Sequence, residues 1–119
     1  MRFLILLDRG PKWKEDVVFH NQPFMPEHAV YVQGGFDRGD VILAGPFMDF
    51  SGGAIVIDAE TEEDALLFAE GDPAVKNGIF TFSLKEWGFR MSKFEAINPE
   101  YGQEYINIKH KHQKELGIL

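Results

Sequence analysis

His28 is the residue of this chain that is best suited to acid–base chemistry. It lies three residues after Met25 and four before Val32, so it shares the apolar stripe of an expected helix. In the first turn of that helix, the positive end of the dipole favours the neutral imidazole that a general base requires. A carboxylate partner would favour the imidazolium instead, and the sequence leaves this balance open. The alternative is a core histidine bonded to a backbone carbonyl group.

Asp72 stands directly before Pro73, in the stretch AEGDPAVKNG at residues 69–78. Aspartate is a favoured helix N-cap, and proline is favoured at the first helical position. The pair therefore predicts a sharp turn followed by a short helical turn. A cap occupies only one carboxylate oxygen, so the other oxygen remains available to a second partner.

Two short segments are candidates for the wall of a binding cleft. Gly45 and Pro46 follow an expected strand, and they either shape the cleft or simply end the strand with a bend. Asp49 and Ser51 come just after them and would reach a substrate unless they are ordinary solvated loop residues. We take all four as candidate substrate-binding residues.

The remaining histidines do not predict a metal site. His110 and His112 are two residues apart among lysines and do not share a helix face, and His20 is isolated. The chain has no cysteine, which excludes disulfides, thiolate nucleophiles and zinc–cysteine sites. There is no phosphate-binding glycine loop and no nucleophile-elbow serine, so we expect neither a metal nor another cofactor.

The overall composition narrows the classes of partner. A net charge of −7 disfavours nucleic acid and anionic membrane surfaces as partners. The apolar run at residues 3–7 is too short for a signal-peptide core or a membrane span, so we expect a cytoplasmic protein. Eleven phenylalanines are many for 119 residues, which suggests that some line a pocket or a subunit interface.

The apolar pattern predicts the elements that position these residues. A strand at residues 2–8 reads as buried on both faces, and a helix beginning near Pro26 reads as ending at Gly39, with Gly34 and Gly35 weakening its middle. Thr61 is expected to cap a second helix that ends at Gly71. The other expected elements are strands at 41–44, 54–59 and 79–84 and a C-terminal helix at 101–116.

This order of elements predicts a ferredoxin-like α+β domain. Strand, helix, strand, strand, helix, strand gives an antiparallel four-stranded sheet with both helices on one face. The other face is left bare and apolar, which favours a homodimer or a higher homo-oligomer. We expect residues 1–87 to form this domain and residues 88–119 to form a C-terminal extension, helical and packed on the domain or its dimer mate.

Several short motifs occur in an order that is similar to a known family. They are Pro26-Glu27-His28, Ala44-Gly45-Pro46, Gly53-Ala54, Asp72-Pro73 and Gly78-Ile79-Phe80. With this spacing the chain resembles the YCII-related family of the dimeric α+β barrel superfamily over residues 2–87. The resemblance implies subunits that pair sheet to sheet and a catalytic His–Asp pair formed by His28 and Asp72. Two departures are a longer connection at residues 10–25 and all of the chain after Trp87.

The resulting functional hypothesis is a cofactor-independent enzyme that acts on a small, partly apolar organic molecule. His28 would move a proton and Asp72 would orient it, which suits isomerisation or elimination. The alternative is a non-catalytic dimer that binds a small metabolite or assists a partner enzyme.

Overall fold

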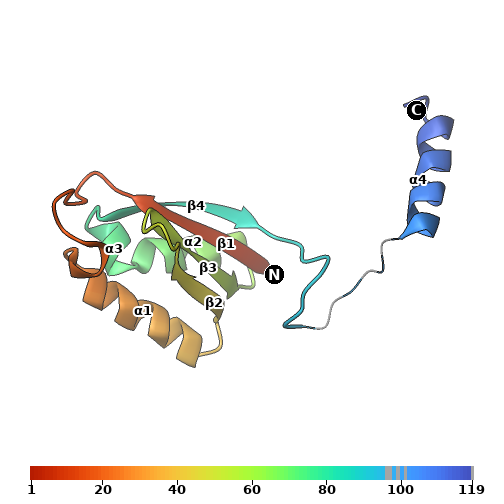
Figure 1. Ribbon diagram of the computed structural model, residues 1–119. Helices are drawn as coiled ribbons and strands as arrows, with labels where there is room; N and C mark the ends of the chain where they lie inside the picture. Colours follow the sequence, from red (N-terminus) through yellow and green to blue (C-terminus); the bar gives the residue numbers. More distant parts are fainter. Residues whose placement is uncertain (96–97, 99, 101, 119) are drawn as a thin grey trace. The chain divides into compact units, whose positions relative to one another are not determined.

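The N-terminal part of the chain folds into one four-stranded sheet and its covering helices (Figure 1). The computed structural model describes residues 1–95, 98, 100 and 102–118. The elements of this part are β1 (Arg2–Arg9), a 3₁₀ turn η1 (Phe19–Asn21), α1 (Met25–Asp37), β2 (Val41–Pro46), β3 (Gly52–Asp58), α2 (Glu62–Gly71), α3 (Pro73–Lys76) and β4 (Phe80–Glu86). The strand order is β2-β3-β1-β4, with every neighbouring pair antiparallel. This confirms the predicted ferredoxin-like α+β fold.

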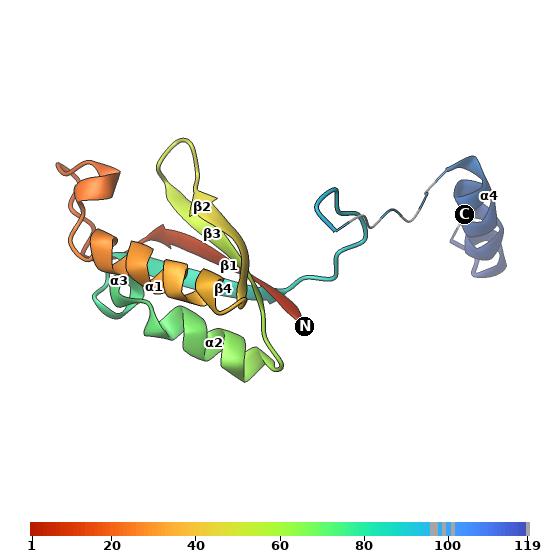
Figure 2. The ribbon, with the colours of Figure 1, turned by 90° about the horizontal axis from the view of Figure 1, so that it is seen from below.

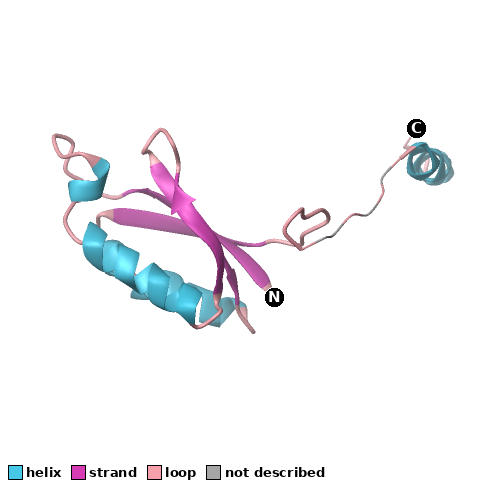
Figure 3. Ribbon diagram, turned by 60° about the horizontal axis from the view of Figure 1, so that its bottom comes forward, coloured by secondary structure: helices cyan, strands magenta, loops and turns pink. Residues whose placement is uncertain are grey.

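The helices α1 and α2 lie on the same face of the sheet (Figures 2 and 3). On that face Phe3, Ile5 and Leu7 of β1 are buried, and Ile5 pairs with the buried Ile55 of β3. Ala65 of α2 is fully buried in the same core. Full burial of side chains such as Phe3 and Ile5 contributes about 1.5–3 kcal/mol each, so this layer is a major source of the domain's stability.

The expectation that β1 is buried on both faces is wrong. Burial alternates along the strand, and Leu4 and Leu6 are only half-buried. The reason is that α1 and α2 both cover the opposite face, where the odd-numbered side chains point. An uninterrupted apolar sequence therefore corresponds here to a strand with one face open.

The first helix continues through its two glycines and ends at Asp37, near the expected stop at Gly39. Gly35 is buried where α1 crosses α2 and β2, and a Cβ atom there would lie 2.9 Å from both Phe68 and Val41. The glycine therefore permits close packing that outweighs its cost of about 1 kcal/mol in helix propensity.

Strand β2 ends later than predicted, at Pro46 instead of residue 44, and β3 begins earlier than predicted, at Gly52 instead of residue 54. Strand β2 includes Gly45 and Pro46, which were expected to follow the strand. It is an edge strand, so the missing N–H of Pro46 removes no bond from the interior of the sheet.

Residues 88–119 form a second compact unit. Its helix is α4 (Gln103–Glu115), which carries His110 and His112 on exposed positions. The expected helix covered 101–116, and residue 101 lies outside the described residues. None of the helices in the described parts of the chain is long and apolar enough to cross a membrane.

Candidate active site

The start of α1 holds His28 in place. Phe24 precedes the helix with a left-handed backbone (φ 65°), and its carbonyl group accepts the first helical hydrogen bond from the His28 N–H at 2.9 Å. Pro26 lies in the first turn, where its missing N–H costs nothing. Met25 is buried and anchors this turn against the core. Three residues that precede His28 at the helix start therefore hold its backbone in place: Phe24 by a hydrogen bond, Met25 by burial and Pro26 by its place in the first turn.

The break between α2 and α3 presents Asp72. Its backbone is extended (φ −63°, ψ 124°), so the chain turns there before Pro73 starts the next helical turn. The Oδ1 atom of Asp72 accepts a hydrogen bond from the N–H of Ala74 at 2.9 Å. The predicted cap is thus present, and it leaves the Oδ2 atom for another partner.

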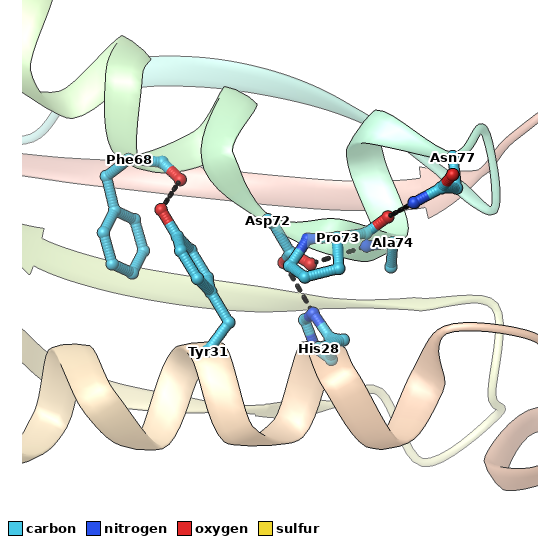
Figure 4. A network of polar contacts seen from close by, with 7 residues as sticks. All are labelled: His28, Tyr31, Phe68, Asp72, Pro73, Ala74 and Asn77. Atoms are coloured by element: carbon cyan, nitrogen blue, oxygen red, sulfur yellow. Dashed lines mark hydrogen bonds and ion pairs between the residues drawn. The ribbon is translucent and has the colours of Figure 1, made fainter.

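That partner is the imidazole of His28 (Figure 4). Its Nδ1 atom lies 2.5 Å from Oδ2 of Asp72, and the exposed fractions of the two side chains are 18% and 3%. A carboxylate only accepts, so Nδ1 carries the hydrogen and donates it. The carboxylate thereby selects the tautomer of a neutral His28 in which Nε2 is unprotonated. Nε2 is the ring nitrogen that remains for a ligand.

A groove of about 660 Å³ runs alongside His28 between α1 and the sheet. Its apolar lining includes Met25, Val32 and Phe36 of α1, Val41 of β2, Ile55 of β3 and Phe80 of β4. Among the described residues that line it, His28 and Gln33 are the polar ones and none is Asp, Glu, Lys or Arg. A mostly apolar cleft with few convergent polar groups is typical of a small-molecule site.

The groove is aromatic at the end that contains His28. The ring of Phe80 meets the imidazole edge-on, with 5.4 Å between the ring centroids. The ring of Phe19, from the connection between β1 and α1, lies 6.0 Å from Phe80 and also lines the groove. A ligand that reaches His28 therefore contacts aromatic rings.

The candidate substrate-binding residues separate into two groups. Gly45 and Pro46, at the end of β2, line the groove. Asp49 and Ser51 lie at the exposed tip of the β2–β3 hairpin and bond to each other. The hydroxyl group of Ser51, followed by its backbone N–H, lowers the pKa of Asp49. Ser51 thus holds one carboxylate oxygen of Asp49 in a local turn, and neither residue lines the groove.

Tyr31 is a neighbour of the site that the sequence alone does not identify. Its hydroxyl group donates to the carbonyl oxygen of Phe68 at 2.8 Å, and its ring lies 5.1 Å from that of Phe68. Burial raises the pKa of Tyr31, and the negative charge of Asp72 raises it further. The available signal was spacing, because residues three apart share a helix face and Tyr31 is three residues after His28. No apolar periodicity in the sequence indicates that Phe19 belongs to the site, because it lies in the irregular connection between β1 and α1.

Other clusters of ionisable groups lie away from this pair. A second hollow of about 470 Å³ is lined by the carboxylates of Asp40, Asp58, Glu60 and Asp64. Asp58 pairs there with Arg2 at 3.0 Å, and Asp40 pairs with Arg38 at 3.2 Å. Within the described part of the chain, no group of three or more His, Cys, Asp or Glu side chains is arranged to hold a metal ion.

A curated protein is similar in sequence to part of this chain. The curated relative YjpA of Bacillus subtilis (strain 168), an uncharacterised protein, is 44% identical over 45 residues, which are 38% of this chain and 53% of YjpA. The matched part thus spans about half the length of that relative.

A solved structure has a similar backbone. It is TftG, the 5-chloro-2-hydroxyhydroquinone dehydrochlorinase of Burkholderia phenoliruptrix AC1100, in complex with 2,5-dihydroxybenzoquinone. The TM-score is 0.58 at 21% identity, over 74% of this chain and 94% of that one, which is a likeness of fold. The family model of the YCII-related domain matches residues 1–88, and the chain therefore belongs to the YCII-related family.

Proposed function

We propose that this protein is a cofactor-independent enzyme that uses His28 and Asp72 for acid–base chemistry on a small, partly apolar organic molecule. The observation that carries the proposal is the 2.5 Å contact between Nδ1 of His28 and Oδ2 of Asp72 at the edge of an apolar groove. Such a contact holds the ring in one orientation and one tautomer, which is what a base needs to act repeatedly on the same substrate atom.

In the proposed reaction, Nε2 of His28 takes a proton from the substrate. Asp72 stabilises the imidazolium that forms, because its carboxylate already faces Nδ1. In an isomerisation His28 returns the proton to another atom of the substrate. In an elimination a leaving group departs with its electron pair while His28 keeps the proton for release to water. Positioned proton transfer of this kind contributes roughly 10²–10⁴-fold to a rate.

The lining of the groove suggests the class of substrate. The aromatic rings of Phe19 and Phe80 beside His28 favour an unsaturated ring, since aromatic rings attract one another at centroid separations of about 4.5–7 Å. TftG, which has a similar fold, is named for removing hydrogen chloride from a hydroxylated chlorinated ring. We therefore propose elimination from, or isomerisation of, a hydroxylated ring compound.

Replacing His28 by glutamine tests the proposed base. We expect the wild-type protein to release chloride from 5-chloro-2-hydroxyhydroquinone and His28→Gln to do so at least about 10²-fold more slowly, since glutamine takes no proton at neutral pH. Chloride release is followed with an ion-selective electrode, under argon to prevent oxidation of the substrate. His112→Gln, at an exposed position of α4, is the matched control and should keep the wild-type rate.

Two outcomes would contradict the proposal. Equal rates for His28→Gln and the wild type would exclude His28 as the base. Binding of the ring compound without turnover of it or of related substituted rings, with His28→Gln reducing affinity alone, would indicate a binding module instead.

A separate NMR experiment on the variant Asp72→Asn tests the partner of the base. Asparagine is also a good N-cap, so its oxygen should keep the bond to Ala74. Its NH₂ group then faces Nδ1 of His28 and moves the ring hydrogen to Nε2, the wrong tautomer for a base. ¹⁵N NMR of the imidazole should show this exchange of protonated nitrogen for His28 and not for His112. Unchanged ring signals would remove Asp72 from the proposed mechanism.

A further inference from the structure

The connection between β1 and α1 is a fixed structure built around one buried amide. Gln22 is 1% exposed. Its Nε2 atom donates to the carbonyl oxygens of Lys14 at 2.6 Å and Val17 at 2.8 Å, and its Oε1 atom accepts from the Lys14 N–H at 2.9 Å. Both ends of the amide are satisfied, so any rearrangement of the segment would leave buried polar groups unpaired.

Trp13 is the second anchor of this connection. Its side chain is 9% exposed and its ring lies 5.5 Å from Phe19 and 5.9 Å from Phe80. The guanidinium group of Arg9 lies 4.9 Å from the centroid of the Trp13 ring. The connection is therefore held against the sheet as well as within itself.

These anchors place Phe19 at the end of the groove that contains His28. Phe19 and His28 both line the groove and both contact the ring of Phe80. The ring of Phe50, from the tip of the β2–β3 hairpin, lies 5.7 Å from Phe19, and the Phe50 carbonyl group accepts a bond from Arg9 at 3.0 Å. Phe19 is thus supported by three other aromatic rings and has little freedom to move away.

We propose that Phe19 is the specificity-determining residue of this site and that Gln22 is a positioning residue for it. Phe19 limits the size of the substituent that a ring ligand can carry next to the atom that meets His28. The identity of the ligand as a hydroxylated ring rests on the proposed function, whereas the size limit concerns binding alone. The connection at residues 10–24 is then the part of the chain that adapts the groove to its substrate.

The test compares the dissociation constants of two probes by isothermal titration calorimetry. The probes are 2,5-dihydroxybenzoquinone and its 3-phenyl derivative. For the wild type we expect tighter binding of the smaller probe. In Phe19→Ala the dissociation constant of the smaller probe should rise about three- to tenfold, because the ring contact is lost. The dissociation constant of the larger probe should fall. The ratio of the two constants should therefore change at least tenfold.

Phe36→Ala is the matched control. Phe36 lines the same groove from the last turn of α1 and is 56% exposed. Its removal should change the two dissociation constants by similar factors and leave their ratio within about twofold. A ratio that changes equally in both variants would overturn the assignment to Phe19, as would failure of the wild type to bind either probe.

Gln22→Ala separates positioning from general stability. Gln22 does not line the groove, so a purely structural role would lower Tm and leave the ratio of Kd values unchanged. Positioning predicts that the ratio shifts in the same direction as in Phe19→Ala, measured well below Tm. Phe19→Leu is a milder change that replaces Phe19→Ala in this test if the alanine variant folds poorly. Its ratio of Kd values should lie between that of the wild type and that expected for Phe19→Ala, and a wild-type ratio would count against the inference.

Turnover distinguishes failure of this inference from failure of the proposed function. A chain that binds both probes with the predicted ratios but is equally active with His28→Gln retains the size limit and loses the proposed base. A chain in which His28→Gln abolishes turnover but Phe19→Ala leaves the ratio unchanged retains the base and loses the size limit.

Discussion

The carboxyl group of Asp72 serves two neighbours at the residue scale. One oxygen caps α3 through the N–H of Ala74, and the other faces Nδ1 of His28. The sequence supported the cap from the Asp–Pro pair alone, since that preference is local. It could not supply the distance to His28, 44 residues earlier, and only the family resemblance suggested that the two meet.

Tyr31 links this pair to the pH dependence of stability. Burial, followed by the charge of Asp72, raises the pKa of Tyr31 above its ordinary value of 10.0. Below about pH 10 the phenol is neutral in both the folded and unfolded states, so the contribution of Tyr31 to the free energy of unfolding is fully present. As the pH rises further, the unfolded chain loses the phenolic proton first, so the stability of the folded state falls.

We therefore expect Tyr31→Phe to reduce the loss of stability above about pH 10, because phenylalanine does not ionise. The free energy of unfolding in urea is compared with that of the wild type at pH 8 and pH 11. The comparison at pH 8, where ionisation of the Tyr31 phenol does not contribute, is the control. An identical decline in Tyr31→Phe and the wild type would show that this phenol does not titrate differently on folding.

At the scale of elements, two polar contacts join α1 to the end of α2. Tyr31 is three residues after His28, and Phe68 is four residues before Asp72, so the two contacts lie about one helical turn apart (Figure 4). Together they set the position of one helix along the other. A shift between the helices would break both contacts at once.

Gly71, the last residue of α2, allows this approach. A Cβ atom there would lie 2.4 Å from the Tyr31 hydroxyl oxygen. We expect Gly71→Ala to destabilise the fold by about 1 kcal/mol, because a steric cost of about 1–3 kcal/mol exceeds the gain in helix propensity of up to about 1 kcal/mol. Urea denaturation measures the change.

A double-mutant cycle isolates the contact between Gly71 and Tyr31. In a Tyr31→Phe background the hydroxyl group is absent, so Gly71→Ala should cost less than in the wild type. Gly88→Ala, where a Cβ would meet nothing within 4 Å, is the control. An equal cost of Gly71→Ala in both backgrounds would place the strain elsewhere.

At the scale of the whole molecule, the open face of the sheet is the feature that a single copy leaves unexplained. Leu4 and Leu6 are half-buried there, and Leu43, which pairs with Val56 on the same face, is 45% exposed. We propose that a second copy of the chain covers this face, sheet to sheet. Apolar sheet surface that remains in water favours such pairing.

Leu6→Glu tests this interface. A charge at the centre of the paired sheets would be buried without a partner, so we expect the variant to sediment as a monomer where the wild type sediments as a dimer. Leu67→Glu, at a 59% exposed position of α2, is the control and should keep the wild-type mass. A wild type that is monomeric at all accessible concentrations would contradict the proposal.

The prediction of β1 shows where reading the sequence alone reaches its limit. The run Phe3-Leu4-Ile5-Leu6-Leu7 identifies a strand, but an apolar sequence does not record whether one face or both are covered within a single copy. Likewise Gly34 and Gly35 lower helix propensity, yet α1 continues through them because Gly35 packs against Phe68 and Val41. In both places long-range packing decides what the local pattern leaves open.

The sequence by itself determined the order of elements, the cap at Thr61, the turn at Asp72 and the ferredoxin-like topology, because these follow from local hydrogen bonding and apolar periodicity. Only the tertiary structure decided that His28 and Asp72 touch and that Phe19 lies beside Phe80. Such contacts join residues that are far apart in the chain or lie in an irregular connection. Their geometry depends on how the helices and the connection at 10–24 pack on the sheet, which no short stretch of sequence encodes.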